Sequence, residues 1–221
     1  MRQRSSTRGA AGFTLIELLV VSSIISILMA LGVAGYTKAR NWADRTASAH
    51  TMRMLGVAIQ MYAVDNDNTL PGPLYNTQNA WYKKNNTSSL GYRLYNYLGS
   101  PAPKGTDQEC KALLTPAFVR MRPKSDSPQY LIQTYIDYDG NPSQMPFGYP
   151  GSADNPNPWK LAMISMAGIT QKYAVQEIDA EHPRVQGWST AGMAPKPVLG
   201  DVRMTLFFDW HVEAIPADQT E

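Results

Sequence analysis

Residues 12–21 read GFTLIELLVV and begin the most apolar stretch of a chain of 221 residues. Between Phe13 and Ala34 the sequence has a single ionisable residue, Glu17, and no proline. A helix of this length rises roughly 33 Å, which is about the thickness of the hydrocarbon core of a bilayer. The stretch therefore predicts a membrane-spanning helix, and the rest of the chain is interpreted outward from it.

Glu17 is an unusual residue for such a helix. On insertion scales an acidic side chain at the centre of a bilayer costs roughly 2.5–3.5 kcal/mol. A carboxylate in this setting needs a partner, and residues 13–34 contain no Lys, Arg or His. We expect the partner to be a positive charge on another copy of the chain, which makes Glu17 a candidate for self-assembly rather than for catalysis.

The order of Gly12, Phe13, Thr14 and Glu17 at the start of an apolar span resembles the cleavage and methylation site of type IV prepilins and type II secretion pseudopilins. The resemblance implies that a prepilin peptidase cuts after Gly12 and methylates the new amino group on Phe13. It also implies that Glu17 pairs with the N-terminal ammonium of a neighbouring subunit, and that an inner-membrane assembly platform is a further partner.

The first twelve residues are basic and contain no acid, which is typical of a leader held at the cytoplasmic face. The alternative is an ordinary secretory signal peptide that is cut between Ala30 and Gly35. The apolar run is longer than the usual core of ~7–15 residues and contains Glu17, which disfavours this alternative. Because Lys38 and Arg40 follow the span, the predicted orientation rests on the family resemblance.

Charge and cysteine content limit the functions that we expect. The chain has 20 Lys and Arg against 18 Asp and Glu, and three of its arginines lie in residues 1–12. We find no basic patch in this count, so the sequence gives no electrostatic case for nucleic-acid binding. The single cysteine, Cys110, excludes an intramolecular disulfide, and no motif around it indicates a nucleophile.

The helical pattern continues beyond the apolar span and becomes amphipathic. Met52, Leu55, Ile59 and Tyr62 recur at intervals of three and four residues along one face. We therefore expect an assembly half of the helix at residues 13–35, an amphipathic half at 36–64, and a periplasmic head at 65–221. The protein would cross the inner membrane once, and it could also reside in a periplasmic or extracellular filament.

The head combines short helices and strands with many Pro, Gly and Asn residues. Its predicted fold class is α+β and pilin-like, with the long helix packed on a small antiparallel sheet that has long loops. The predicted helices are residues 90–98 and 159–167. The predicted strands are residues 129–138, 171–178, 202–208 and 211–215.

The last predicted hairpin carries a second resemblance. Residues 200–215 resemble the C-terminal signature of a pseudopilin-like family, in which a histidine precedes an Asp-Gly turn. Here Leu199 stands in place of the histidine and Trp210 in place of the glycine. Tryptophan accepts a positive φ poorly, so we expect this turn to be rebuilt.

Two acidic clusters are candidate cation sites. Asp137, Asp139 and Asn141 loosely resemble a calcium loop, but the bidentate acid that completes such a loop is absent. We expect a solvated turn there, with calcium as the alternative and no other cofactor. A second cluster, in which we expect a solvated strand edge with a cation site as the alternative, consists of Glu177, Asp179, Glu181 and His182.

These observations favour a structural subunit of a type II secretion pseudopilus or a type IV pilus-like filament, which associates with itself and with other pseudopilins. The alternative is a membrane-anchored extracytoplasmic protein that binds a ligand or cation and does not polymerise. Shearing of cells separates the two, because a filament subunit enters high-mass fractions. The sequence contains no arrangement of residues that supports an enzyme.

Overall fold

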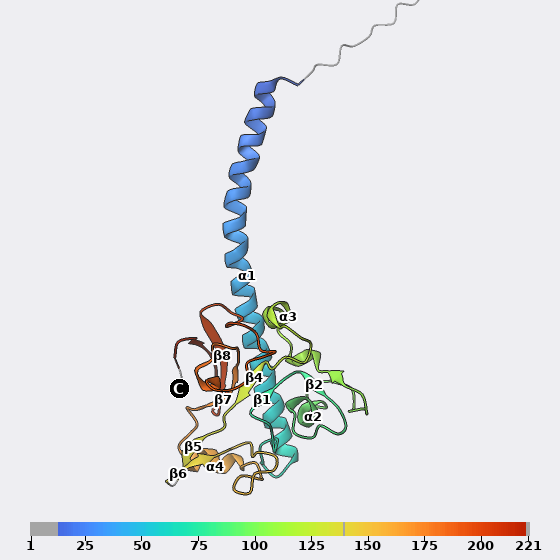
Figure 1. The fold of residues 1–221 in the computed structure, drawn as a ribbon, viewed down its shortest axis with the longest axis vertical. Coiled ribbons are helices and arrows are strands. Elements are labelled where there is room, and N and C mark those ends of the chain that lie inside the picture. The colour runs from blue at the N-terminus through green and yellow to red at the C-terminus, as the bar shows by residue number, and fades with distance from the viewer. Residues whose placement is uncertain (1–12, 139, 220–221) are drawn as a thin grey trace, which may run out of the picture. The chain divides into compact units, whose positions relative to one another are not determined.

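The computed structural model describes residues 13–138 and 140–219. Helix α1 spans Leu15–Asp65, which matches the predicted extent of the long helix (Figure 1). The chain divides into two compact units, Met1–Trp42 and Ala43–Glu221, and α1 contributes residues to both. The two units are therefore described separately.

The first unit consists of the apolar part of α1. Its large apolar side chains are all exposed, with exposed fractions between 45% at Ile25 and 84% at Leu15. The hydroxyl groups of Ser22, Ser23 and Ser26 donate to backbone carbonyls one turn earlier, so the helix itself satisfies them. Among the described residues, α1 is the one helix that is long and apolar enough to cross a membrane. This finding is consistent with a membrane anchor.

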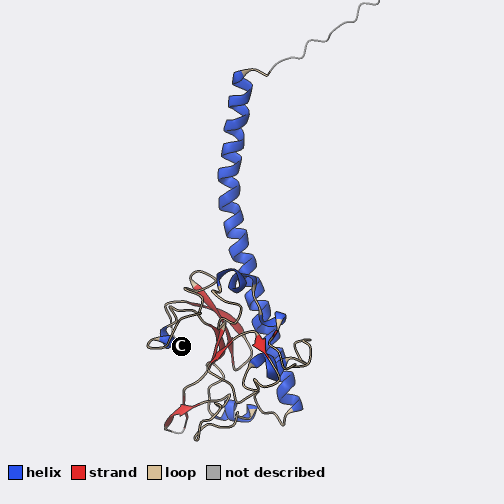
Figure 2. Ribbon diagram, turned by 45° about the vertical axis from the view of Figure 1, so that its right-hand side comes forward, coloured by secondary structure: helices blue, strands red, loops and turns tan. Residues whose placement is uncertain are grey.

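The second unit contains the rest of α1 and all other elements (Figure 2). Its other helices are α2 (Leu90–Leu94), α3 (Pro116–Met121), α4 (Leu161–Met166) and two 3-10 turns, η1 (Lys111–Leu113) and η2 (Pro183–Val185). Its strands are β1 (Thr77–Gln78), β2 (Trp81–Tyr82), β3 (Gln108–Glu109), β4 (Tyr130–Ile132), β5 (Ile136–Tyr138), β6 (Asn141–Gln144), β7 (Tyr173–Glu177), β8 (Val202–Phe207) and β9 (Val212–Pro216).

The central sheet has five antiparallel strands in the order β1-β4-β7-β8-β9. Val175 in the middle of β7 pairs with Ile132 of β4 and Leu206 of β8, and Leu206 pairs with Val212 of β9. Two small hairpins, β2–β3 and β5–β6, stand outside this sheet. The predicted α+β class, with a long apolar helix and a small antiparallel sheet, is confirmed.

The main core lies between α1 and one face of the sheet. Met52, Leu55 and Ile59 are buried in it, as the helical spacing predicted. A Cβ atom on Gly56 would stand 3.0 Å from Cδ1 of Leu206, so this glycine permits a close approach of the helix to β8. The other face of the sheet contributes a second, smaller core of Leu131, Tyr173, Ile178, Val185 and Met193. Every residue of β8 is consequently buried.

The predicted strand at residues 129–138 was wrong, because the chain forms two strands there in different sheets. The ladder of β4 ends after Ile132, and the side chain of Gln133 donates a hydrogen bond to the carbonyl of Tyr135 at 2.9 Å. This local bond satisfies a carbonyl that would otherwise continue the ladder.

The predicted hairpin at the C-terminal end is present, but its turn was predicted wrongly. Trp210 itself has φ of +72°, so the turn keeps the left-handed residue although no glycine is there. The Trp210 N–H donates to the carbonyl of Phe207, and the Phe207 N–H donates to the carbonyl of His211. These bonds close a three-residue loop in which the last residue occupies the position that usually requires glycine. Leu199 is buried in the main core.

Candidate functional site

The first turn of α1 holds Glu17 in a reciprocal arrangement with Thr14. The carboxylate atom Oε2 accepts the Thr14 backbone N–H at 2.8 Å and the Thr14 hydroxyl at 2.7 Å. The Thr14 hydroxyl in turn accepts the Glu17 backbone N–H at 3.3 Å. This is a capping box, in which a Thr and a Glu three residues apart satisfy donors that the helix leaves unpaired.

The expectation that residues 13–34 contain no partner for Glu17 was wrong for hydrogen-bond donors. Thr14 supplies two of them, and the T-x-x-E pattern that encodes this arrangement was present in the sequence. Glu17 also lies at the positive end of the helix dipole, which favours a negative charge. No Lys or Arg pairs with Glu17 among the described residues, so its pairing with a cation remains a prediction.

The surface around Glu17 is apolar. Phe13, Ile16, Val20 and Val21 line a shallow groove of about 300 Å³ beside the carboxylate. All of these side chains are exposed, and Phe13 is the most N-terminal of them. Gly12, the predicted cleavage site, lies outside the described residues. The described part of the segment thus presents one carboxylate within an exposed, mainly apolar surface.

Comparison with known proteins gives one match for this segment. The family described as prokaryotic N-terminal methylation motif matches residues 7–33, which include Gly12, Phe13 and Glu17. The chain carries a prokaryotic N-terminal methylation motif. This finding agrees with the type IV prepilin and pseudopilin family that the sequence indicated. No curated protein and no solved structure matches the chain.

Beyond the methylation motif, the second unit of the chain contains a buried ion pair. Arg203 donates to both carboxylate oxygens of Asp179, at 2.6 and 2.9 Å, and also to the carbonyl of Ala217. Asp179 further accepts the backbone N–H of Glu181 at 2.9 Å. Asp179 is only 1% exposed, so the predicted solvated edge was wrong for this residue. Glu181, by contrast, is exposed as predicted.

Glu177 is also buried, at 3% exposure, which contradicts the predicted solvated edge. Its Oε2 atom accepts the Met204 backbone N–H at 3.0 Å. The other oxygen, Oε1, and the hydroxyl of Ser48 on α1 are both buried without a hydrogen-bond partner in the described part of the chain. Burial raises the pKa of Glu177 to about 7, although the Met204 N–H and the neighbouring Ser48 hydroxyl act in the opposite direction.

His182 completes the buried polar cluster of the head. Its Nδ1 accepts the backbone N–H of Arg184 at 3.1 Å, and its Nε2 lies 2.8 Å from Oε1 of Gln176. The Gln176 side chain donates onward to the Thr205 hydroxyl at 2.9 Å. Burial lowers the pKa of His182 to about 4, and the nearby positive charge of Arg203 contributes in the same direction. The ring is therefore neutral at pH 7.

The predicted cation sites are described only in part. Within residues 13–138 and 140–219, no group of three His, Cys, Asp or Glu side chains could hold a metal ion. Asp137 is exposed, whereas Asp139 and the side chain of Asn141 lie outside the described residues. Calcium binding at that turn therefore remains an untested prediction.

Cys110 is buried, and its sulfur lies 3.2 Å from the hydroxyl of Ser100. Burial raises the pKa of the Cys110 thiol, so the reactive thiolate form is disfavoured at pH 7.

A polar cleft of about 430 Å³ lies beside β2. Its polar groups already bond to one another. The Trp81 indole N–H donates to the carbonyl of Ser125, and Asn79 donates to the carbonyl of Asp126. Lys83 pairs with Asp107 at 3.1 Å, so these groups do not depend on a ligand for hydrogen bonding.

Proposed function

We propose that the chain is a structural subunit of a type II secretion pseudopilus or a type IV pilus-like filament. Before assembly it crosses the inner membrane once through the apolar part of α1, with its C-terminal region in the periplasm. Prepilin peptidase, an assembly platform and other pseudopilins are its partners. The exposed apolar helix with one carboxylate near its start carries the proposal, since such a surface must be covered by lipid or by other helices.

Processing would remove residues 1–12. Hydrolysis of the bond between Gly12 and Phe13 creates a new amino terminus on Phe13, which then receives a methyl group. Thr14 becomes the second residue of the mature chain, so both partners of the capping box remain after the cut. The carboxylate of Glu17 is thereby held close to the new amino terminus by the fold of its own helix turn.

Glu17 would set the register between subunits. In the membrane, the hydrogen bonds from Thr14 stabilise the carboxylate without a counter-ion. During assembly, the ammonium group on Phe13 of a neighbouring subunit would approach Oε1, which accepts no hydrogen bond among the described residues. The pairing would neutralise a charge that is costly in an apolar setting, and it is available in one register only.

The first test is the mass and N-terminal sequence of the mature protein isolated from membranes. We expect a chain that begins at N-methylated Phe13. A chain that begins between Gly32 and Tyr36 would instead indicate an ordinary signal peptide. In that case the membrane helix, the filament and the role of Glu17 would all be rejected together.

The second test concerns assembly. Glu17→Val is expected to leave processing intact and to remove the chain from the high-mass fraction that is sheared from cells. Ser22→Val is the matched control, because it also replaces an exposed polar side chain of α1 with valine but removes no charge. Normal amounts of Glu17→Val in sheared filaments would refute the register role.

The cleft beside β2 favours one second candidate, a membrane-anchored binding protein that does not polymerise. The wild-type shearing experiment separates the two functions, because an anchored receptor remains with the membrane fraction. The internal bonding of the cleft residues, such as Trp81 with Ser125, supports the filament subunit over this candidate.

A further inference from the structure

The charges of the head are divided between two parts of its sequence. Residues 80–127 contain eight Lys and Arg against three Asp and Glu, whereas residues 128–221 contain five against eleven. The near-zero charge balance of the whole chain conceals this division. The fold determines whether the basic segment and the acidic segment lie close enough in one head to neutralise each other.

Four exposed lysines form what we call the basic flank, and they are Lys84, Lys104, Lys111 and Lys124. None of them takes part in an ion pair with the described residues. The backbone N–H of Lys84 donates to the carbonyl of Lys104 at 2.7 Å, so the backbones of these two lysines lie side by side. The positive charges of these lysines repel one another. Binding of a negatively charged partner relieves this repulsion and is therefore favourable.

The hairpin of β8 and β9 forms the opposite surface, which we call the acidic flank and define by Asp209, Glu213 and Asp218. All three side chains are exposed. Residues 204–221 contain no Lys or Arg, and their one histidine, His211, lies 2.5 Å from Asp209 and 3.8 Å from Glu213 through its two ring nitrogens. Arg203, which precedes the segment, is buried and bound to Asp179.

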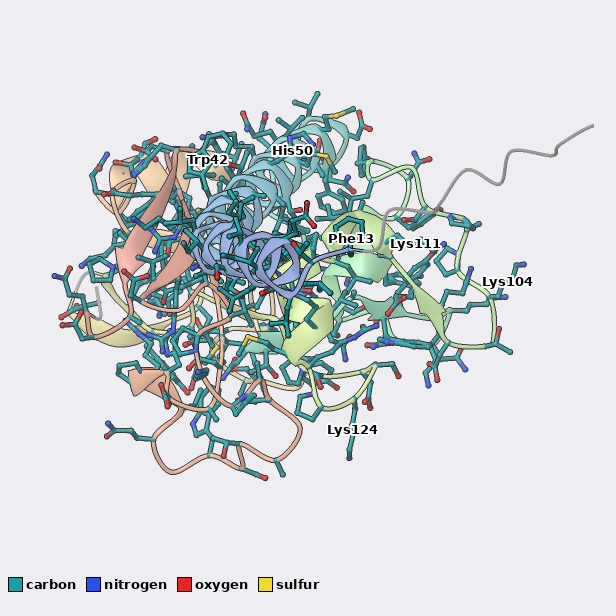
Figure 3. All side chains as sticks on the ribbon, turned by 90° about the horizontal axis from the view of Figure 1, so that it is seen from above. Phe13, Trp42, His50, Lys104, Lys111 and Lys124 are labelled. Carbon is teal, nitrogen blue, oxygen red and sulfur yellow. The ribbon has the colours of Figure 1, made fainter. Side chains whose placement is uncertain are left out.

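The two flanks lie on different sides of the head. In Figure 1 β8 lies to the left of the head part of α1, while β2 and α2 lie to its right. Figure 3, viewed from above, shows Lys104 and Lys111 on the right, Lys124 at the bottom, and the strands of the β8–β9 hairpin on the left. The basic and acidic flanks therefore do not neutralise each other within one chain.

We propose that the basic flank of one head docks on the acidic flank of a second copy of this chain. A contact between two different surfaces of identical subunits is heterologous, and it propagates from copy to copy instead of closing into a dimer. Such propagation requires the two flanks to lie on different sides of the head, because each head then contacts one copy through its basic flank and another through its acidic flank. This inference rests on the proposed filament function, to which it adds a contact between heads that is separate from the contact at Glu17.

Cross-linking of the wild-type full-length chain in membranes tests the contact directly. A carbodiimide joins an amine to a carboxylate only where the two groups touch. We expect peptides that link Lys104 or Lys111 of one chain to Glu213 or Asp218 of another, and mixed heavy and light isotope labels identify links between chains. Abundant links between chains that join other surfaces, with none between the two flanks, would overturn the proposal.

Charge reversal tests how much the contact between the two flanks contributes to assembly. Lys104→Glu with Lys111→Glu is expected to lower the amount of chain in sheared filaments roughly tenfold, since exposed ion pairs contribute up to ~1 kcal/mol each and reversal makes them repulsive. Lys160→Glu with Lys196→Glu is the matched control. It changes the net charge equally at two exposed lysines outside the basic flank and should have no effect.

The four-substitution chain provides the decisive comparison. Adding Glu213→Lys and Asp218→Lys to the reversed basic flank restores opposite charges across the contact, so assembly should recover. A folded four-substitution chain that assembles no better than the double variant would contradict the proposal. So would a double variant that assembles normally and loses only retention on DNA, because the basic flank would then bind a polyanion.

Failure of this proposal is distinguishable from failure of the filament function. Wild-type filaments without cross-links between the two flanks would reject the contact and retain the function. Cross-links between the flanks in a chain that never enters a sheared high-mass fraction would retain the contact and reject the filament.

Discussion

Glu17 and Glu177 show two ways in which this chain accommodates a carboxylate in apolar surroundings. Glu17 lies on an exposed helix, and its two donors come from a residue three positions earlier. Glu177 is buried between the sheet and α1, and its single donor comes from Met204, which is 27 positions away. A local pattern in the sequence encodes the first arrangement, whereas only the tertiary fold creates the second.

The difference has an energetic side. The Glu17 arrangement satisfies backbone donors that every helix leaves unpaired, so the charge stabilises the helix start. The Glu177 arrangement removes the carboxyl group from water and supplies few donors in return, so burial disfavours the ionised form. The same side chain therefore stabilises one region and limits the stability of the other.

The largest effect on the head is expected from its buried ion pair. Asp179→Ala leaves the Arg203 guanidinium buried without a counter-charge and should lower the free energy of unfolding by about 3–5 kcal/mol. Denaturant unfolding of the full-length chain in detergent micelles measures the loss. Asp201→Ala is the control, because it removes the exposed pair with Arg45 and should cost at most ~1 kcal/mol. Equal losses in the two variants would show that burial of the pair is unimportant.

A pH-dependent effect of similar origin is expected at Glu177. The pKa of this carboxyl is about 7 in the folded chain, above its ordinary value of 4.5, so the folded state binds the proton more tightly. The contribution of Glu177 to stability therefore falls as pH rises from 4.5 to 7. Glu177→Gln should be more stable than wild type by about 3 kcal/mol at pH 8 and equally stable at pH 4.

His182 contributes the opposite dependence. Its pKa is about 4 when folded, below the ordinary value of 6.5, so stability rises with pH between these two values. The two trends oppose each other in the wild type, and Glu177→Gln should reveal the histidine trend alone. Unfolding measured from pH 4 to pH 8 tests this, and a variant with a flat profile would contradict the assignment.

A smaller effect is expected at the C-terminal turn. Trp210 has a positive φ, which is strained for any residue with a Cβ atom. Trp210→Gly should therefore be more stable than Trp210→Ala by about 1–2 kcal/mol, since both variants lose the same indole and differ only in the Cβ atom. Thermal unfolding of the two variants gives the difference, and a more stable alanine variant would show that the turn relaxes to another conformation.

The smallest effect is expected at the helix start. Thr14→Ala removes the hydroxyl that caps the helix and should destabilise its first turn by about 1 kcal/mol. Amide hydrogen exchange in detergent micelles should become faster at residues 15–18 and stay unchanged in the head. Ser22→Ala is the control, since its hydroxyl bonds only to a carbonyl within the helix.

Local features of this molecule could be predicted from the sequence, and long-range ones could not. The length of α1, its buried positions such as Leu55, and the C-terminal hairpin follow from spacing within a few residues. Burial of Glu177 and Asp179 does not, because it depends on Arg203, Met204 and a second layer of chain over the sheet. Nor does the burial of every residue of β8, because both faces of this strand are covered by other parts of the chain.

The candidate site followed the same division. The methylation motif and Glu17 were evident from residue order, and Thr14 could have been identified as the cap from its spacing to Glu17. The two flanks of the head could not be identified in this way, because the sequence does not reveal that Lys104 and the β8–β9 hairpin lie on different sides.

Two consecutive residues of α1 also form ion pairs with other segments of the head. Asp44 pairs with Arg120 of α3, and Arg45 pairs with Asp201 immediately before β8. Both pairs precede the first core residue of the helix, Met52, along the chain. Before α1 reaches the hydrophobic core, neighbouring residues of the helix are therefore joined to two separate segments of the head.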